Sequence, residues 1–324
     1  MKAILSTKPG TPDDLEFVDL PDPAAGPGEV VVRVRAAALN FFDTLIIADK
    51  YQIKPPRPFS PGAEFSGIVE SLGEGVTAFR PGDGVIGYIR HGAVRERVAV
   101  KASKLVALPQ GLDFDRAAGL SAIHGTTYHA LKDRGHLQAG ETLAVLGAAG
   151  GVGISAVEIG KLLGARVIGC ASSDEKCAFA RKHGADETIN YGAQDLKAEL
   201  KRLGGERGID VIYDPVGGAF SESALRALGW GGRFLVIGFA SGEIPRMPLN
   251  LTLLKSCDIV GVSWGGFAER FPEQHAANMR EIVRWVAEGK LTVPIHAVYA
   301  LRDTPQALKE IAARKVMGKV IIRL

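Results

Sequence analysis

The segment from residue 142 to residue 171 constrains the fold more than any other part of the sequence. It begins with the short apolar run TLAVLG (142–147) and continues through AAGGVG (148–153) and a helical pattern that reaches Leu163. A second apolar run, RVIGCAS (166–172), follows at once. Two buried strands joined by a helix form a right-handed βαβ unit with parallel strands. Similar apolar runs recur at 209–214 and 233–239, so we predict a parallel sheet covered by helices.

The residues before this segment follow a different pattern. Val30, Val32 and Val34 alternate with their neighbours in the two-residue period of a strand. Pro-Gly and Gly-rich turns recur along the same stretch, for example at Pro61-Gly62. Short strands at this spacing predict a compact β-rich domain, such as a partly open barrel. The chain as a whole is therefore predicted to be an α/β protein with two domains.

Helix boundaries can be predicted at two further places. The segment after Ala171 has the pattern of a helix capped by Ser173 or Asp174 and ended by Gly184. Near the end of the chain, a helix is predicted to begin with Thr304 as its cap and Pro305 in its first position.

Charge and cysteine content exclude several classes of function. Lys and Arg number 39 and Asp and Glu 36, a net charge of +3 with both signs interspersed, which does not indicate binding to nucleic acid or to a membrane surface. Three cysteines are too few for a disulfide framework or a four-cysteine zinc site. The N-terminal residues lack the apolar core of a signal peptide, and the longest charge-free run near the middle is shorter than the ~20 residues of a membrane-spanning helix. We expect a cytoplasmic protein.

The run AAGGVG has the context of a dinucleotide-binding turn. Gly150 and Gly151 would let the backbone approach a pyrophosphate, whose charge is favoured at the start of a helix. Gly153 would let the helix pack closely against the first strand. Ala148 stands where the strict G-x-G-x-x-G pattern has its first glycine, so the alternative of a purely structural turn stays open.

The end of the second strand favours NADPH over NADH. Enzymes that prefer NAD place Asp or Glu about 20 residues after the glycines, where it binds the ribose 2′-hydroxyl. Here the sequence is Ala171-Ser172-Ser173, with Lys176 shortly after, so hydroxyl groups and an ammonium could hold a 2′-phosphate. The alternative is that Ser173 only caps the next helix and that Lys176 is a solvated surface residue.

Motifs spread over nearly the whole chain resemble the quinone oxidoreductase (zeta-crystallin-like) group of the medium-chain dehydrogenase/reductase superfamily. They are MKAIL at the start, ALNFFD (38–43), PGAEFSGIVESLGEGV (61–76), GDGVIG (82–87), AAGGVG, HGADETINY (183–191), DVIYDPVGG (210–218) and GKVIIRL (318–324). The resemblance implies a GroES-like β-rich catalytic domain at 1–122, completed by 266–324, and a Rossmann NADPH-binding domain with a doubly wound parallel sheet at 123–265. It also implies a homodimer and hydride transfer from NADPH to a quinone or a similar α,β-unsaturated carbonyl.

The sequence departs from the zinc-dependent relatives at two positions. They have a cysteine where this chain has Asn40, and a Gly-His-Glu where it has Gly62-Ala63-Glu64. Because Ala63 has no donor atom and an uncharged Asn40 is a poor zinc ligand, we predict that no metal is bound. We interpret the histidines, including His124 and His129, as structural or surface residues.

The resemblance also assigns roles to single residues. Asn40 and Asp43 would lie beside the nicotinamide and the substrate, and Tyr51 matches a tyrosine that donates a proton in the enoyl-thioester-reducing relatives. Tyr51 would otherwise be a packing residue, and the aromatic residues of the cofactor set could equally belong to the core. The set expected to contact the cofactor comprises Asn40, Thr127, Ala149, Gly150, Gly151, Val152, Ser172, Ser173, Lys176, Tyr191, Phe239 and Trp264.

Three functions are compatible with these observations. The leading one is a zinc-independent, NADPH-dependent reductase of quinones. The enzymatic alternative is an enoyl-thioester reductase with Tyr51 as proton donor, and the non-enzymatic one is an NADPH-binding, crystallin-like protein. The segments 88–95 and 240–250, which lie where this family lines its substrate site, match no pattern that identifies the acceptor.

Overall fold

The computed structural model describes all 324 residues, which form two compact units. Unit 1 comprises Met1–Ala122 and Val293–Leu324, and unit 2 comprises Ile123–Thr292. The prediction that residues 266–292 belong to the first domain is wrong. They form most of α9 (Trp264–Arg270) and α10 (Pro272–Ala287), and the Trp285 ring of α10 packs 5.6 Å from the Tyr128 ring inside unit 2.

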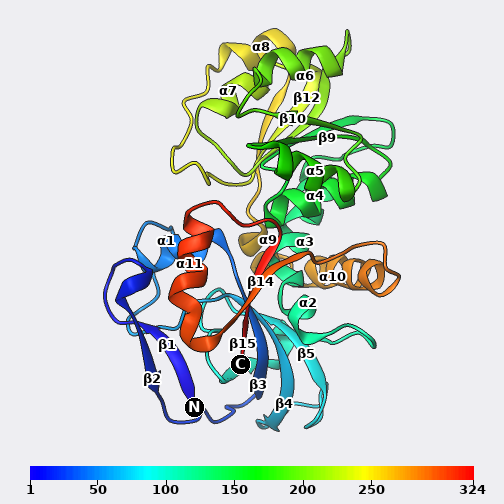
Figure 1. The fold of residues 1–324 in the computed structure, drawn as a ribbon. Coiled ribbons are helices and arrows are strands. Elements are labelled where there is room, and N and C mark those ends of the chain that lie inside the picture. The colour runs from blue at the N-terminus through cyan, green and yellow to red at the C-terminus, as the bar shows by residue number, and fades with distance from the viewer. The chain divides into compact units, whose positions relative to one another are not determined.

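Unit 1 is built on a seven-stranded sheet whose order is β14-β15-β3-β4-β5-β7, with β6 paired to β3 (Figure 1). A separate antiparallel pair is formed by β1 and β2. The strands are β1 (Lys2–Ser6), β2 (Leu15–Asp19), β3 (Glu29–Leu39), β4 (Glu64–Leu72), β5 (Gly84–Tyr88), β6 (Arg97–Lys101), β7 (Leu105–Ala107), β14 (Ile295–Ala300) and β15 (Lys319–Arg323). The helices are α1 (Phe41–Ile47), α2 (Phe114–Ala118) and α11 (Thr304–Ala312), and the short 3₁₀ turns are η1 (Pro12–Asp14), η2 (Ala102–Lys104) and η4 (Leu301–Asp303).

The long strand β3 organises unit 1. Val30, Val32 and Val34, which the two-residue period predicted to share a face, are all buried in the core of this unit. Val31 on the opposite face is buried as well, whereas Arg33 is exposed, so that face is only partly open to water. The second chain segment supplies β15, which pairs antiparallel with β3 on one side and parallel with β14 on the other.

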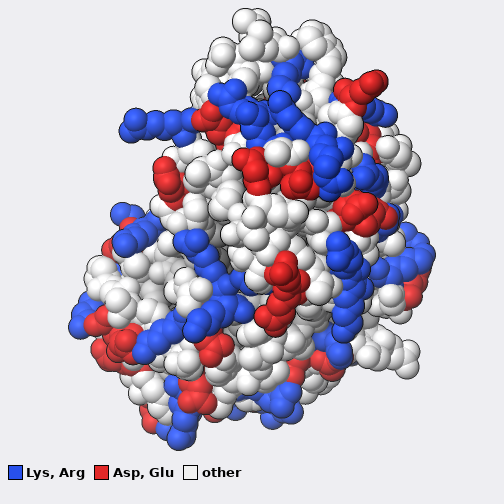
Figure 2. Space-filling view, turned by 45° about the horizontal axis from the view of Figure 1, so that its top comes forward, with Lys and Arg blue, Asp and Glu red and all other residues white.

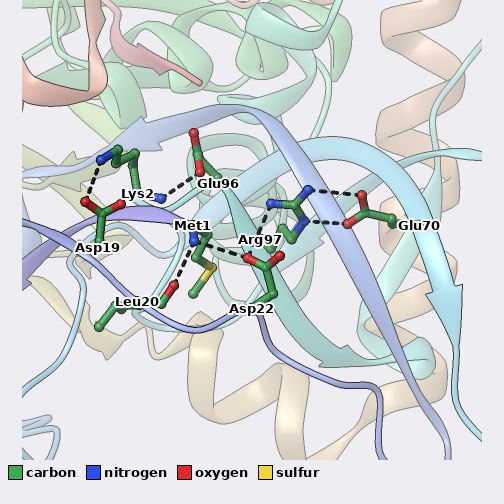
Figure 3. Close-up of polar contacts among 8 residues, drawn as sticks. All are labelled: Met1, Lys2, Asp19, Leu20, Asp22, Glu70, Glu96 and Arg97. Atoms are coloured by element: carbon green, nitrogen blue, oxygen red, sulfur yellow. Dashed lines mark hydrogen bonds and ion pairs between the residues drawn. The ribbon is translucent and has the colours of Figure 1, made fainter.

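Polar contacts fasten the N-terminus to this unit (Figure 3). The Met1 ammonium donates to the Leu20 carbonyl at 2.7 Å, and the Lys2 ammonium pairs with Asp19 at 2.5 Å. The Lys2 backbone N–H donates to the Glu96 carboxylate at 2.6 Å, which links β1 to the segment that leads into β6. The first strand is thereby held at both its backbone and its terminus.

Unit 2 contains a six-stranded, fully parallel sheet in the order β10-β9-β8-β11-β12-β13. This is the doubly wound order typical of dinucleotide-binding folds, and it confirms the predicted α/β class with a Rossmann domain. The strands are β8 (Thr142–Leu146), β9 (Arg166–Ala171), β10 (Glu187–Asn190), β11 (Ile209–Asp214), β12 (Leu228–Val236) and β13 (Asp258–Gly261). The remaining helices are α3 (Leu120–Tyr128), which spans the boundary at Ala122, the π-helix η3 (His129–Arg134), α4 (Gly151–Leu162), α5 (Asp174–Lys182), α6 (Leu196–Gly204), α7 (Ala219–Leu225) and α8 (Asn250–Lys255).

Helices cover both faces of this sheet. Apolar residues of α6, α7 and α8, such as Leu200 and Leu251, join the inward residues of β8 and β9 in one core cluster. On the other face, Gly160 of α4 packs against Leu143 and Gly169 of β9 packs against Ala180 of α5. A Cβ atom would lie 2.7 Å from the Leu143 side chain at Gly160 and 3.1 Å from the Ala180 side chain at Gly169. Figure 1 shows α4 and α5 next to β9.

The predicted helix ends are correct at α5 and wrong at α11. The Ser173 side chain caps α5 by accepting from the Lys176 N–H at 3.3 Å, and Gly184 follows the helix with a φ of 107°. At α11 the N-cap is Asp303, while Thr304 is the first helical residue. The Thr304 hydroxyl donates to the Leu301 carbonyl at 2.7 Å, so it is engaged with the preceding turn and cannot cap the helix.

Basic and acidic side chains are mixed over the face drawn in Figure 2, as expected from the sequence. None of the helices combines the length and the apolar character that crossing a membrane requires.

Candidate active site

The glycine-rich turn of unit 2 requires glycine for steric reasons. A Cβ at Gly153 would lie 2.1 Å from the Gly147 carbonyl oxygen, so no larger residue fits between β8 and the first turn of α4. Gly147 itself has a φ of 61°, in the left-handed region that favours glycine. The turn therefore presses the start of α4 against the end of β8, as the sequence predicted for Gly153.

The start of α4 has the properties of a phosphate site. Gly150 is the N-cap residue and provides no side chain to bond the amides of the first turn. The N–H groups of Gly151 and Val152 point out of a helix start, where the helix dipole favours negative charge. A Cβ at Gly150 would meet only the Gly147 oxygen, at 3.5 Å, so a ligand can approach the backbone closely. Ala149, beside it, is buried and shapes the turn.

Thr127 is brought to the same turn. Its hydroxyl donates to the Val152 carbonyl at 3.2 Å and lies 2.9 Å from the Tyr213 hydroxyl of β11. Both Thr127 and Tyr213 are fully buried, and burial raises the pKa of Tyr213 so that its hydroxyl stays protonated. These contacts of Thr127 hold the end of α3 against α4. The sequence analysis did not identify Tyr213 as part of the site.

Four predicted residues meet at the end of β9. The Lys176 ammonium lies 3.3 Å from the Ser172 hydroxyl, while Ser173 caps α5. The Tyr191 N–H donates to the Ala171 carbonyl at 2.9 Å, and its ring packs 4.4 Å from Phe220. The nearest carboxylate in sequence, Asp174, accepts from the Asn190 amide at 2.8 Å. The Ser172 hydroxyl and the Lys176 ammonium thus lie together at the end of β9, and binding of a 2′-phosphate by these residues stays a prediction.

The two remaining aromatic candidates differ in their surroundings. Trp264 is buried in unit 2, where its ring packs on Gly125 and lies 5.5 Å from the His275 ring. Phe239 follows β12 and is 37% exposed, so part of its ring remains accessible to a ligand. Trp264 belongs to the core of its unit, whereas Phe239 is available for the predicted contact.

In unit 1, Asn40 and Asp43 form the start of α1. The Asp43 carboxylate accepts from the Asn40 N–H at 2.7 Å and from the Gly62 N–H at 3.1 Å. Its side chain is buried, and burial raises the pKa of Asp43 to about 7, although both N–H groups and the Lys319 charge act in the opposite direction. Asp43 is thus a buried carboxyl group that can gain or lose a proton near neutral pH.

This pKa predicts a pH-dependent effect of Asp43→Asn. Because the pKa of Asp43 is about 7 in the folded chain and 3.8 in the unfolded one, the folded state holds an extra proton between these pH values. The free energy of unfolding of the wild type therefore falls as the pH rises through this window, with a slope of up to ~1.4 kcal/mol per pH unit from this group. Denaturant titrations should show the variant gaining stability relative to the wild type between pH 4 and 7. Parallel pH profiles for the two proteins would contradict the assignment.

A buried ion pair between Glu64 and Lys319 holds the side chain of Asn40. The Lys319 ammonium lies 2.6 Å from Glu64 Oε1, 2.7 Å from Asn40 Oδ1 and 3.1 Å from the Leu39 carbonyl oxygen. Glu64 Oε1 also accepts from the Asn40 amide at 3.0 Å, and its Oε2 accepts from the Ala122 N–H at 2.7 Å. Every polar atom of this cluster has a partner, so the orientation of the Asn40 carboxamide is set by charge and hydrogen bonding together.

These contacts do not match a zinc site. The Asn40 oxygen faces the Lys319 ammonium, its amide nitrogen donates to Glu64, and the residue between them in the motif is Ala63. Of the Cys, His and carboxylate donors that tetrahedral zinc takes, this arrangement offers only the Glu64 carboxylate, which is already paired with the Lys319 ammonium. No group of three or more His, Cys, Asp or Glu side chains is placed to hold a metal ion elsewhere in the chain.

Tyr51 lies in the same unit as a partly buried residue whose ring stacks on Phe42 at 5.8 Å. Burial raises its pKa, and the Asp43 charge adds to this effect, so the hydroxyl keeps its proton at neutral pH. Tyr88, the cross-strand partner of Glu64, also has a pKa raised by burial. Tyr51 contributes to the raised pKa of Tyr88, so the two hydroxyls lie near each other, and the sequence analysis did not name Tyr88.

The two histidines named in the sequence have structural surroundings. His124 is fully buried, with its Nε2 atom 3.0 Å from the Thr292 carbonyl oxygen. His129 pairs with Asp133 at 2.8 Å and stacks on the Phe267 ring at 4.0 Å.

Glu64 and Lys319 are the main residues that the sequence analysis did not place in the site. The Gly62-Ala63-Glu64 motif was interpreted only through the histidine that Ala63 replaces, and the role of Glu64 was not predicted. The available signal was a lysine directly before the apolar run 320–322 of the closing strand, because a buried lysine needs a partner.

Comparison with known proteins agrees with this fold. Residues 26–110 match the alcohol dehydrogenase GroES-like domain, and residues 151–281 match the zinc-binding dehydrogenase family. A GroES-like domain joined to a Rossmann domain defines the medium-chain dehydrogenase/reductase superfamily.

Within that superfamily the chain belongs to the quinone oxidoreductase family. The quinone oxidoreductase of Pseudomonas aeruginosa is 35% identical over 97% of this chain and 96% of that protein. The structure of quinone oxidoreductase from Pseudomonas syringae pv. Tomato superposes with a TM-score of 0.93 at 34% identity, covering 100% of this chain and 99% of that one. Escherichia coli quinone oxidoreductase, solved in complex with NADPH, gives 0.92 at 29% identity and covers 100% of both chains.

Proposed function

We propose that this oxidoreductase is a zinc-independent enzyme that transfers a hydride from NADPH to a quinone or a similar α,β-unsaturated carbonyl. The observation that carries the choice of cofactor is the end of β9, where Lys176 and Ser172 stand in place of a carboxylate. The NADPH complex of the Escherichia coli relative supports it. Around Asn40 there is no Cys or His donor, and the one carboxylate, Glu64, is paired with the Lys319 ammonium, which supports a reaction without a metal.

The nicotinamide, when bound, supplies the hydride, and the residues of this chain bind and orient the reactants. The amides at the start of α4 hold the pyrophosphate, and Ser172, Ser173 and Lys176 hold the 2′-phosphate. Asn40 presents a carboxamide whose orientation is fixed by Glu64 and Lys319. A reduced quinone can take its proton from water, so the reaction needs no general acid, although Asp43 can exchange a proton near pH 7.

NADPH oxidation by the purified protein tests this proposal. We expect turnover with quinones, weaker turnover with simple enals or enoyl thioesters, and no loss of activity after treatment with a chelator. Activity that a chelator removes and zinc restores would contradict the zinc-independent mechanism. NADPH binding without turnover of any acceptor would leave the crystallin-like binding role.

Tyr51→Phe separates the quinone and enoyl-thioester hypotheses. If Tyr51 donates a proton in the transition state, its loss should reduce turnover by ~10²-fold or more, the usual magnitude for general acid catalysis. If Tyr51 only packs on Phe42, turnover of a quinone should change little while the Michaelis constant rises somewhat. We expect the second result with a quinone. Steady-state kinetics of both proteins with a quinone and an enoyl thioester give the answer, and a large loss with the quinone would favour the proton-donor mechanism.

We also propose that two copies of the chain pair through unit 2. The strand β13 lies at the end of the six-stranded sheet and pairs with β12 alone, so its outer edge can extend the sheet of a second copy. Ile259 on this strand is 36% exposed. Light scattering should give the mass of a dimer at micromolar concentration, and a monomer would contradict the pairing.

A further inference from the structure

The loop that follows β5 carries three basic residues, Arg90, His91 and Arg95, within six positions. Backbone hydrogen bonds join this loop to the segment that precedes β4. The Ile89 N–H donates to the Ala63 carbonyl at 2.7 Å, and the Ala93 N–H donates to the Gly62 carbonyl at 2.9 Å. The position of this loop in unit 1 is therefore well defined.

Two of these basic side chains have buried nitrogen atoms without a partner. Arg95 Nε and His91 Nδ1 are both inaccessible to water and make no hydrogen bond. The Arg95 guanidinium forms no ion pair, and burial lowers its pKa, because nothing compensates its charge. The neighbouring carboxylate of Glu96 is already bonded to the Lys2 backbone N–H at 2.6 Å. A partly buried guanidinium without a counter-charge is costly, since charges inside proteins are normally paired.

The groups around His91 are also basic. Burial lowers the pKa of His91, and the charges of Arg95, Arg90 and Lys104 lower it further, with no carboxylate acting against them. The His91 ring packs edge-on against the Phe59 ring at 5.7 Å. The Arg57 guanidinium lies 5.3 Å from the Phe59 ring as well. This basic cluster, defined here as Arg90, His91, Arg95 and Lys104, therefore combines positive charge with a partly apolar wall.

The basic cluster lies beside the residues that the proposed reaction uses in unit 1. The Gly62 carbonyl that accepts from this loop belongs to the residue whose N–H binds Asp43. The positive charge of Arg90 acts to lower the pKa values of the Tyr51 and Tyr88 hydroxyls, whereas burial raises both. Arg90 also has a φ of 65°, a left-handed conformation that is costly for a non-glycine residue and is found most often at functional sites.

We propose that the basic cluster binds an anionic group of the acceptor, such as a carboxylate, sulfonate or phosphate, with Arg95 as its main partner. This inference rests on the proposed function and narrows its substrate class to acceptors that carry a negative charge. A guanidinium can donate two parallel hydrogen bonds to such a group, and partial burial strengthens them. The bound anion would supply the counter-charge that Arg95 lacks.

A matched pair of acceptors tests the inference. Values of kcat/KM are measured at saturating NADPH for a naphthoquinone and for its sulfonated analogue, and their ratio is compared between proteins. We expect the wild type to favour the sulfonated acceptor and Arg95→Met to reduce the ratio by about tenfold or more. Arg97→Met is the control, because Arg97 of β6 already has a counter-charge in Glu70 of β4 at 2.7 Å (Figure 3), and it should leave the ratio within about twofold.

A second measurement does not depend on any variant folding. Inorganic phosphate should raise the Michaelis constant of the wild type for the sulfonated quinone and leave that for the neutral quinone unchanged. Equal inhibition of both acceptors, or a ratio unchanged in Arg95→Met, would overturn the inference while the proposed reaction stands. If the wild type reduces neither quinone, the proposed function is contradicted. The anionic group could then not belong to a substrate of this reaction.

Discussion

Replacement of Lys319 by methionine is expected to lower the free energy of unfolding by about 3–5 kcal/mol, the usual result of removing one partner of a buried ion pair. The side chains of Lys319 and Glu64 are 2% and 0% exposed, and their charged atoms lie 2.6 Å apart. Without the ammonium, Glu64 must either remain charged in an apolar environment or take up a proton. The Leu39 carbonyl and the Asn40 oxygen would lose a donor as well.

Urea titration of the purified variants measures this effect. Lys309→Met is the matched control, because Lys309 is exposed on α11 of the same unit and pairs only with the exposed Asp13. Exposed ion pairs contribute about 0–1 kcal/mol, so the control should unfold at nearly the wild-type urea concentration. The double variant Glu64→Gln, Lys319→Met should be more stable than the sum of its single effects predicts. A loss for Lys319→Met no larger than for the control would show that the pair does not stabilise unit 1.

The second large effect concerns the choice of cofactor, where NADPH is expected to bind about a hundredfold more tightly than NADH. Charge-assisted hydrogen bonds contribute roughly 1.5–3 kcal/mol each where water is partly excluded. Ser172 is exposed and Lys176 half-buried, so we discount the total to about 2–3 kcal/mol, which corresponds to about a hundredfold in affinity. Lys176→Ala should weaken NADPH binding by roughly tenfold, about half of this free energy, and leave NADH binding nearly unaffected.

Calorimetric titration of both cofactors gives these dissociation constants directly. Lys182→Ala provides the control, because Lys182 is an exposed lysine at the opposite end of the same helix, α5. It should alter neither constant. Equal affinities of the wild type for NADPH and NADH would show that the end of β9 does not recognise the 2′-phosphate.

The features that the sequence predicted correctly depend on neighbours a few residues apart. The apolar runs of β8 and β9, the Ser173 cap and the turn at Gly153 are all determined within one βαβ unit. Such local patterns are readable because the backbone geometry and the burial of each residue follow from a short stretch of chain.

The residues that were missed depend on contacts between distant parts of the chain. Glu64 and Lys319 are 255 positions apart, so no local pattern pairs them. The position of 266–292 was also set by tertiary packing, since α10 buries Met279, Ile282 and Trp285 inside unit 2. The unpartnered nitrogen of Arg95 became visible only when its surroundings were known, because the sequence shows the charge but not the burial.

The arrangement of unit 1 has a consequence for biosynthesis. Its central sheet includes β15, which lies between β14 and β3, although the ribosome makes β15 only after the whole of unit 2. Until β15 is synthesised, β3 has an unpaired edge and Glu64 has no Lys319 to neutralise its charge. Unit 2 is a continuous segment and can fold as soon as it leaves the ribosome. Translation should accordingly yield a folded Rossmann domain first and expose the N-terminal strands to chaperones until Lys319 arrives.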